Sequence, residues 1–334
     1  MSLFERLAKL RAEREAETKA HGSPTPGIGS MPKEAGPREE RLKVPAYLFG
    51  GNEVRTECGP FCLRQLRVKE DLDVCLPPPE LITRNLRLLW GVGPVTERAL
   101  KAQGLGTVYD LCNHPRWAEE ARRVLSLIRT RRAAELRRRG ARDVELLGLF
   151  APYEVVCLDI ETTGLWANQP LFLVGVLCLD QGELVLKQLL ARHYQEERAL
   201  LTYLSRLLAQ AQVIVTFNGK RFDLPYIEQR LVYHNLPPLK ELFQVDLYFH
   251  ARRLPQDLPN RRLVTLEEYL LGKEREGDVP GYLVPTLYHR FVRTGEAQLL
   301  QPVLEHNVQD VISLARLLYL VGHRQGEVTG GAVG

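Results

Sequence analysis

The chain has 334 residues, of which 45% are hydrophobic and 26% are charged, and its formal net charge is +4. This length and composition are typical of a soluble globular protein with about two domains. No stretch approaches the roughly 18 consecutive apolar residues of a membrane span, and the charged N-terminal stretch lacks the apolar centre of a signal peptide. The composition therefore excludes a membrane-spanning protein, and we expect a cytoplasmic one.

The first 82 residues divide into two parts. Residues 1–42 join a charged amphipathic stretch to HGSPTPGIGSMPKEAGPREE, which is rich in Pro, Gly and charge and is expected to be a flexible linker. Residues 43–82 contain AYLFGG, RTECGPFCLRQLRV and LDVCLPPPE, which we expect to form a few short strands with turns. No motif indicates the role of this second part.

The six cysteines are spread over separate predicted elements. Cys58, Cys62 and Cys75 could ligate zinc, but no well-spaced fourth ligand accompanies them. Cys157 and Cys178 lie inside apolar, strand-like runs, where a thiol behaves as a small hydrophobic residue. We therefore expect reduced thiols and no disulfide framework.

Residues 83–144 are expected to form a small helical domain. In LRLLWGVGPVTERALKAQGLGTVYDL, two short helical patterns flank GVGP. Gly91 and Gly93 permit a tight turn whose main-chain N–H groups face outward at a helix N-terminus, and Pro94 suits the first turn of that helix. The stretch resembles a helix-hairpin-helix module, which implies binding of a nucleic-acid backbone without reading its sequence. The alternative is an ordinary packing unit whose glycines only make the corner.

An arginine-rich stretch follows directly. Between residues 116 and 142, ten arginines stand against three glutamates, so the rest of the chain is net acidic. Such a stretch can simply be the solvated face of a helix, but this excess of cations beside the hairpin pattern favours a polyanion, since phosphate neutralisation gives sequence-independent affinity. Arg122, Arg129 and Arg132 are candidate phosphate contacts.

Residues 145–322 have the clearest order of elements. YEVVCLD, PLFLVGVLCL and ELVLKQLL indicate three successive strands, and helices then alternate with the short strands QVIVTF and FQVD before three helical patterns end the domain. This order predicts an α/β domain with a five-stranded mixed sheet flanked by helices, as in a ribonuclease H-like fold. Residues 323–334 are expected to be a disordered tail.

Four acids stand out against apolar surroundings in this domain. Asp159 and Glu161 share one face at the end of a strand, Asp223 lies in FNGKRFDLP, and Asp310 lies in EHNVQDVISL. Taken singly, these acids could be a helix cap, a strand end or a surface residue. Carboxylates converging at one sheet edge would repel one another by several kcal/mol in low dielectric unless divalent cations lay between them, and oxygen ligation favours Mg²⁺ or Mn²⁺. Two such ions about 4 Å apart would serve phosphodiester hydrolysis.

Further side chains accompany the acids. His306 lies one helical turn before Asp310, so its imidazole can point into the same site and act as general base. Asn218 closes the strand QVIVTF at the carboxyl edge of the sheet and is a candidate nucleic-acid contact. Lys220 and Arg221 follow it as candidate phosphate contacts or simply as exposed loop cations. Asp246 in VDLYFH is either a further acid near the site or a helix cap.

LDIETTGL, TFNGKRFDLP and HNVQD, in this order, resemble the three motifs of the DEDD (DnaQ-like) superfamily of 3′–5′ exonucleases, and residues 145–321 are similar to its YprB-like branch. The resemblance implies that Asp159, Glu161, Asp223 and Asp310 are metal ligands and that His306 is the general base. In the histidine variant of this superfamily the base usually stands five residues before the last Asp, a position that Glu305 holds here.

The sequence therefore predicts a two-metal 3′–5′ exonuclease whose helical domain holds DNA. The combination indicates DNA repair, with an unidentified helicase or repair protein as a partner. The alternatives are a ribonuclease with the same chemistry, a non-catalytic DNA-binding scaffold, and a proofreading subunit of a polymerase. The order of the three motifs favours the enzyme over the scaffold.

Overall fold

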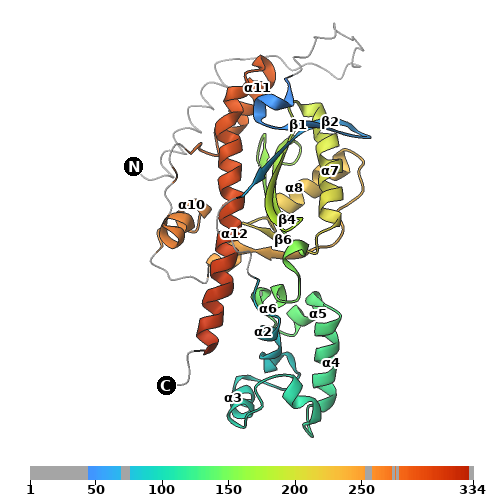
Figure 1. The fold of residues 1–334 in the computed structure, drawn as a ribbon, viewed down its shortest axis with the longest axis vertical. Coiled ribbons are helices and arrows are strands. Elements are labelled where there is room, and N and C mark those ends of the chain that lie inside the picture. Colours follow the sequence, from blue (N-terminus) through green and yellow to red (C-terminus); the bar gives the residue numbers. More distant parts are fainter. Residues whose placement is uncertain (1–43, 69–75, 253–257, 273–274, 276–277, 331–334) are drawn as a thin grey trace, which may run out of the picture. The chain divides into compact units, whose positions relative to one another are not determined.

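The computed structural model describes residues 44–68, 76–252, 258–272, 275 and 278–330. Its core is a seven-stranded mixed sheet in the order β1-β2-β5-β4-β3-β6-β7 (Figure 1). The strands are β1 Asn52–Thr56, β2 Gly59–Arg67, β3 Val155–Thr162, β4 Leu171–Asp180, β5 Glu183–Leu190, β6 Val213–Thr216 and β7 Phe243–Asp246. Neighbours from β1 to β3 are antiparallel, whereas β3, β6 and β7 are parallel. The α/β ribonuclease H-like architecture is confirmed, with two more strands than expected.

The two additional strands form a hairpin at one edge of the sheet. β2 pairs antiparallel with β5, and Leu63 lies opposite Leu189. Phe61 at this edge is fully buried in the main core. Arg192, just after β5, also pairs with Glu53 of β1 at 2.9 Å. Residues 52–67, whose role the sequence left open, therefore complete the sheet.

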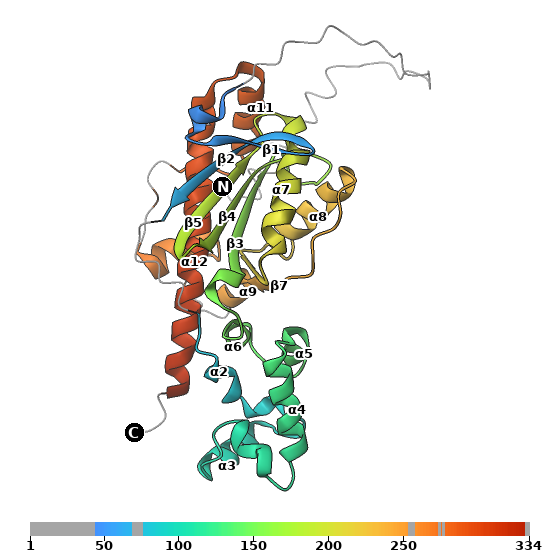
Figure 2. The same ribbon diagram turned by 45° about the vertical axis from the view of Figure 1, so that its right-hand side comes forward.

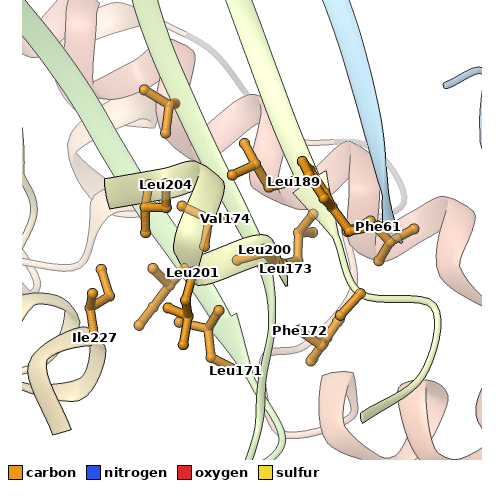
Figure 3. Packing of buried hydrophobic residues seen from close by; sticks show 14 of the residues in the cluster. Phe61, Leu171, Phe172, Leu173, Val174, Leu189, Leu200, Leu201, Leu204 and Ile227 are labelled. Carbon is orange, nitrogen blue, oxygen red and sulfur yellow. The ribbon is translucent and has the colours of Figure 1, made fainter. Parts of the chain in front are cut away.

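Helices cover both faces of the sheet, as Figures 1 and 2 show. α7 (Glu197–Ala209) and α8 (Asp223–Tyr233) pack on one face, and α12 (Gln301–Gly330) packs on the other. Figure 3 shows the first of these interfaces, in which leucines of α7 and Ile227 of α8 meet apolar side chains of the strands. Because side chains of a strand alternate, β3 directs Val156, Leu158 and Ile160 to this face. It therefore directs Asp159 and Glu161 toward α12.

A buried ion network holds the loop that follows β3. Glu197 of α7 accepts hydrogen bonds from Arg230 at 2.7 Å and from the N–H of Leu171 at 2.9 Å. Arg230 also donates to the carbonyl of Ala167 at 3.1 Å, and the Tyr226 hydroxyl is 2.9 Å from the carbonyl of Gln169. A charge removed from water is tolerated where it is paired in this way. The loop after β3 is therefore fixed by α7 and α8.

Residues 80–147 form a helical subdomain with its own apolar core. Its elements are α2 Glu80–Thr83, η2 Leu86–Leu88, α3 Pro94–Ala102, η3 Tyr109–Asn113, α4 Ala118–Arg129, α5 Ala133–Arg138 and α6 Asp143–Leu147. The arginine-rich stretch forms two helices, because Arg131 between them takes a φ of 53° that ends α4.

The remaining elements are short except for α11 and α12. They are η1 Ala46–Phe49, η4 Pro152–Glu154, η5 Tyr194–Glu196, α9 Leu247–Ala251, α10 Leu263–Leu266, the π-helical turn η6 Glu267–Leu271, α11 Val284–Thr294 and η7 Ala297–Leu300. α12 continues to Gly330, so the helix does not stop at the expected boundary of residue 322; no proline follows Pro302 to end it. The expected N-terminal linker lies outside the described residues.

Candidate active site

The central strand β3 carries the first two acids. Asp159 lies opposite Gly175 of β4, and Glu161 lies opposite Leu173, just before a register shift that ends the regular pairing. Both carboxylates face α12, which carries His306 and Asp310 on consecutive turns. Asp223 is the first residue of α8 and is 5% exposed. Three elements that are distant in the chain thus contribute to one site.

The pKa values show that the four carboxylates interact. Burial raises the pKa of Asp159 well above its usual value, and the charges of Asp310, Asp223 and Glu161 raise it further. Burial followed by the charges of Asp310 and Asp223 does the same to the pKa of Glu161. Burial also raises the pKa of Asp223 to about 7 and that of Asp310 above its usual value. The acids predicted from the sequence therefore form one cluster, in which Arg275 supplies a positive charge beside Asp310.

The chemistry of this donor set fits a divalent cation. Four carboxylates in a poorly solvated site offer the oxygen ligands that Mg²⁺ and Mn²⁺ prefer. Among the described residues, no group of three or more acids, histidines or cysteines has the geometry of a metal site. Two of the carboxylates also accept hydrogen bonds from protein groups: Arg275 donates to Asp310 at 2.5 Å, and Asn307 donates to Asp159 at 2.9 Å.

His306 and Glu305 lie differently on α12. The His306 Nε2 atom is 3.4 Å from Asp310 Oδ2 and 4.0 Å from Glu161 Oε1. Glu305 is exposed and accepts a hydrogen bond from Gln301. The geometry therefore places the histidine, not the glutamate at the five-residue spacing, beside the carboxylates.

A chain of buried amides supports Asp159. The Asn307 side chain, fully buried, donates to Asp159 Oδ2 and accepts from Gln188 Nε2 at 2.9 Å, while Arg64 donates to Gln188 Oε1 at 2.9 Å. A Cβ at Gly175 would lie 2.3 Å from Asn307 Oδ1, so glycine is the residue that leaves room for this amide. Sequence reasoning missed Asn307 and Gln188; a glutamine inside the apolar strand ELVLKQLL was the available signal.

A second supporting group lies before α11. Arg275 makes two hydrogen bonds to Glu267, at 2.5 and 2.8 Å, besides its contact with Asp310. The Ser313 hydroxyl also donates to Glu267. Asp278 accepts from His306 Nδ1 at 2.5 Å. No sequence pattern had singled out these residues.

Asp246 organises the turn after β6. It is fully buried and accepts hydrogen bonds from the N–H groups of Asn218 at 2.7 Å and Lys220 at 3.2 Å. It also caps α9 through the N–H of Tyr248, which matches the helix-cap alternative, and its charge contributes to the raised pKa of Asp223. Asn218 has a φ of 63°, a left-handed conformation in which it turns the main chain after β6.

The two cations after this turn lie against an aromatic ring. Lys220 Nζ is 5.9 Å from the centre of the Phe249 ring, and the Arg221 guanidinium is 5.6 Å from it. Burial lowers the pKa of Lys220. Arg221 is exposed, so it is the more accessible of the two candidate phosphate contacts.

The predicted hairpin residues lie in the helical subdomain. Gly91 has a φ of +83°, a conformation that favours glycine, whereas Gly93 has an ordinary φ of −92° and precedes the first residue of α3. Arg122 donates to the carbonyl of Cys112 at 2.8 Å, and Arg132 pairs with Glu135. Arg129 is exposed and pairs with no acid among the described residues.

Much of the arginine-rich stretch is neutralised within the fold. Five of its ten arginines form ion pairs with acids: Arg131, Arg132, Arg137, Arg139 and Arg142. The same subdomain contains a cleft of about 690 Å³. Its lining includes four cationic side chains, Arg84, Arg87, Lys101 and Arg142. Lys101 and Arg142 pair with Glu97 and Glu145, whereas exposed Arg84 and Arg87 pair with no acid that the structure describes.

Two further expectations concern cysteines and membranes. Cys58, Cys62, Cys112, Cys157 and Cys178 are free thiols, and Cys75 lies outside the described residues. Burial raises the pKa of Cys62 to about 11. Within the described ranges, no helix is long and apolar enough to cross a bilayer.

Comparison with known proteins identifies several relatives. Residues 156–321 match the family model RNase_H_2, of the RNase_H superfamily. Over 165 residues the chain is 39% identical to the protein YprB of Bacillus subtilis (strain 168), an alignment that covers 48% of this chain and 40% of YprB. Over 125 residues it is 34% identical to DNA polymerase 1 of Aeropyrum pernix, covering 36% of this chain and 12% of the polymerase.

A solved structure also matches. The family B DNA polymerase of the hyperthermophilic archaeon Pyrobaculum calidifontis aligns with a TM-score of 0.41 and 19% sequence identity. The alignment covers 51% of this chain and 25% of the polymerase chain. The chain thus spans less than half the length of each of these relatives.

Proposed function

We propose that the protein is a Mg²⁺- or Mn²⁺-dependent 3′–5′ exonuclease that hydrolyses phosphodiester bonds of DNA. The match of residues 156–321 to a family model of the RNase_H superfamily supports this proposal. The observation that carries the proposal is the cluster of Asp159, Glu161, Asp223 and Asp310 with His306 at one side of β3. The similarity to a DNA polymerase makes DNA the first substrate to test. A role in DNA repair belongs to the same proposal.

The roles of the residues follow from their contacts. Asp159, Glu161, Asp223 and Asp310 would hold one or two divalent ions, which supply Lewis acidity toward the phosphodiester when bound. Asn307 orients the carboxylate of Asp159 through its hydrogen bond to Oδ2. His306 Nε2 faces the carboxylates and takes a proton from the attacking water.

Digestion of end-labelled nucleic acids tests this function. With Mg²⁺ or Mn²⁺, the purified protein should shorten a single-stranded or 3′-recessed DNA from its 3′ end, and EDTA should stop the reaction. Matched RNA and a 3′-blocked DNA serve as controls. Digestion of RNA alone would assign a ribonuclease, and DNA binding without hydrolysis under any metal would assign a scaffold; either result overturns the proposal.

We further propose that the helical subdomain holds the nucleic-acid backbone, as a helix-hairpin-helix module would, and that its cleft contributes to this contact. Arg84 and Arg87 on the cleft wall are exposed and pair with no described acid, so their charge is available to phosphates. Each phosphate that a cation neutralises releases counterions and adds to the salt dependence of binding.

The double variant Arg84→Glu/Arg87→Glu should therefore bind DNA more weakly, with a salt slope smaller by about 2, roughly 1 for each lost phosphate contact. Fluorescence anisotropy with a labelled oligonucleotide at several salt concentrations measures both quantities. Arg67→Glu/Arg206→Glu makes the same change of net charge at exposed arginines of β2 and α7 and serves as the matched control. Equal losses in the two double variants would show a general charge effect and refute the role of the cleft.

A further inference from the structure

The two nitrogens of His306 have different surroundings. Nδ1 is 2.5 Å from Asp278 Oδ1, whereas Nε2 is 3.4 Å from Asp310 Oδ2 and 4.0 Å from Glu161 Oε1. One side of the ring is therefore engaged by a single carboxylate at hydrogen-bond distance. The other side is turned toward the acid cluster.

The Asp278 carboxylate is itself held on both oxygens. Oδ2 is 3.3 Å from Arg275 Nη1, while Oδ1 contacts the histidine. Arg275 is 5% exposed and is clamped by the two oxygens of Glu267, which is 3% exposed. The position of Asp278 is thus set by a buried arginine rather than by solvent.

We propose that Asp278 is a positioning residue that keeps His306 in the tautomer with the proton on Nδ1, so that the Nε2 lone pair faces the carboxylate cluster. A carboxylate oxygen accepts hydrogen bonds, so Nδ1 must be the donor, and the hydrogen bond made by one ring nitrogen decides which nitrogen carries the proton. This inference rests on the proposed function, in which His306 is the general base.

The proton balance of the step follows from this arrangement. The attacking water gives one proton to Nε2 as its oxygen bonds to phosphorus, and the bond from phosphorus to the leaving sugar oxygen breaks. The ring then carries protons on both nitrogens, and the Asp278 carboxylate stabilises that cation. The leaving oxygen takes a proton from solvent, and Nε2 returns its proton to solvent.

Nitrogen NMR of the histidine rings tests the tautomer without any substrate. With ¹⁵N-labelled protein about two pH units above the usual histidine pKa, His306 is assigned as the signal missing from His306→Gln. Wild type should show the Nδ1–H form, Asp278→Asn should populate the Nε2–H form, and Asp278→Glu should restore the Nδ1–H form. Asp180→Asn is the matched control, because it removes an acid of β4 that pairs with Lys187 of β5.

Kinetics supply the second readout. Asp278→Asn should lower kcat by about 10- to 100-fold with little change in KM, and Asp278→Glu should recover part of the loss. An Nε2–H tautomer in the wild type, or no change of tautomer in Asp278→Asn, overturns the inference. If the protein hydrolyses no nucleic acid, the proposed function fails while the tautomer experiment still decides what Asp278 does to the ring.

Discussion

Asp159→Asn is expected to abolish hydrolysis while leaving nucleic-acid binding intact. The substitution keeps the shape of the side chain and an oxygen that can accept the hydrogen bond from Asn307, but it removes one charge from the cluster that would hold the metal. Metal ions contribute several kcal/mol of transition-state stabilisation, so the rate should fall roughly 10³-fold or more. Initial rates on end-labelled DNA and anisotropy binding measure the two effects.

The same substitution should stabilise the metal-free protein, because one of four mutually repelling carboxylates is gone. A variant that is inactive but more stable has lost a metal ligand and not its fold. Asp180→Asn on the neighbouring strand β4 is the control and should keep the wild-type rate. If Asp159→Asn hydrolysed DNA at the wild-type rate, Asp159 and the proposed metal site would have no part in the reaction.

The metal-free protein is expected to lose stability as the pH rises from about 4 to about 7. Burial and neighbouring carboxylates raise the pKa of Asp159, Glu161 and Asp310, and that of Asp223 to about 7. In this pH window the folded chain binds protons that the unfolded chain has released, so the free energy of unfolding falls with rising pH. Each unit of pKa difference contributes about 1.4 kcal/mol.

Chemical denaturation in EDTA at several pH values measures this slope. Asp223→Asn should flatten it, because the amide does not titrate. Mg²⁺ should raise the melting temperature more near pH 7 than near pH 5, since a cation binds the ionised cluster and stabilises the state it binds. A stability that stays level or increases over this window would show that the carboxylates are not strained by one another.

The elements of residues 145–322 could be predicted because their signals are local. The apolar runs that became β3, β4 and β5 and the helical spacing of α7 and α12 each lie within a short window. The pairing of β2 with β5 joins residues more than a hundred positions apart, and no local pattern specifies such a partner. Prediction from sequence fails in the same way for the arginine-rich stretch. The charges can be counted in the sequence, but the pairing of Arg137 with Asp143 is visible only in the structure.

The residues of the site fall into the same two groups, those that local motifs indicate and those that only contacts between distant segments bring in. Asp159, Glu161, Asp223, Asp310 and His306 stand in motifs whose spacing indicates a shared chemistry. Their supporting residues act only through contacts between distant segments: Gln188 of β5 reaches α12, and Asp278 reaches His306. Asn218 and Asp246 were noticed, but their contact with each other required the parallel pairing of β6 and β7.

The hairpin β1–β2 determines where the chain can be cut to obtain a stable fragment. The family match begins at residue 156, yet Phe49 and Phe61, which precede the helical subdomain, are buried in the core of the sheet. A fragment cut at the start of the match would expose the edge of β5 and the apolar surface that these rings cover. Unpaired strand edges of this kind recruit other chains. The segment recognisable by homology is thus smaller than the unit that shares this core, and we expect that excising it would favour aggregation.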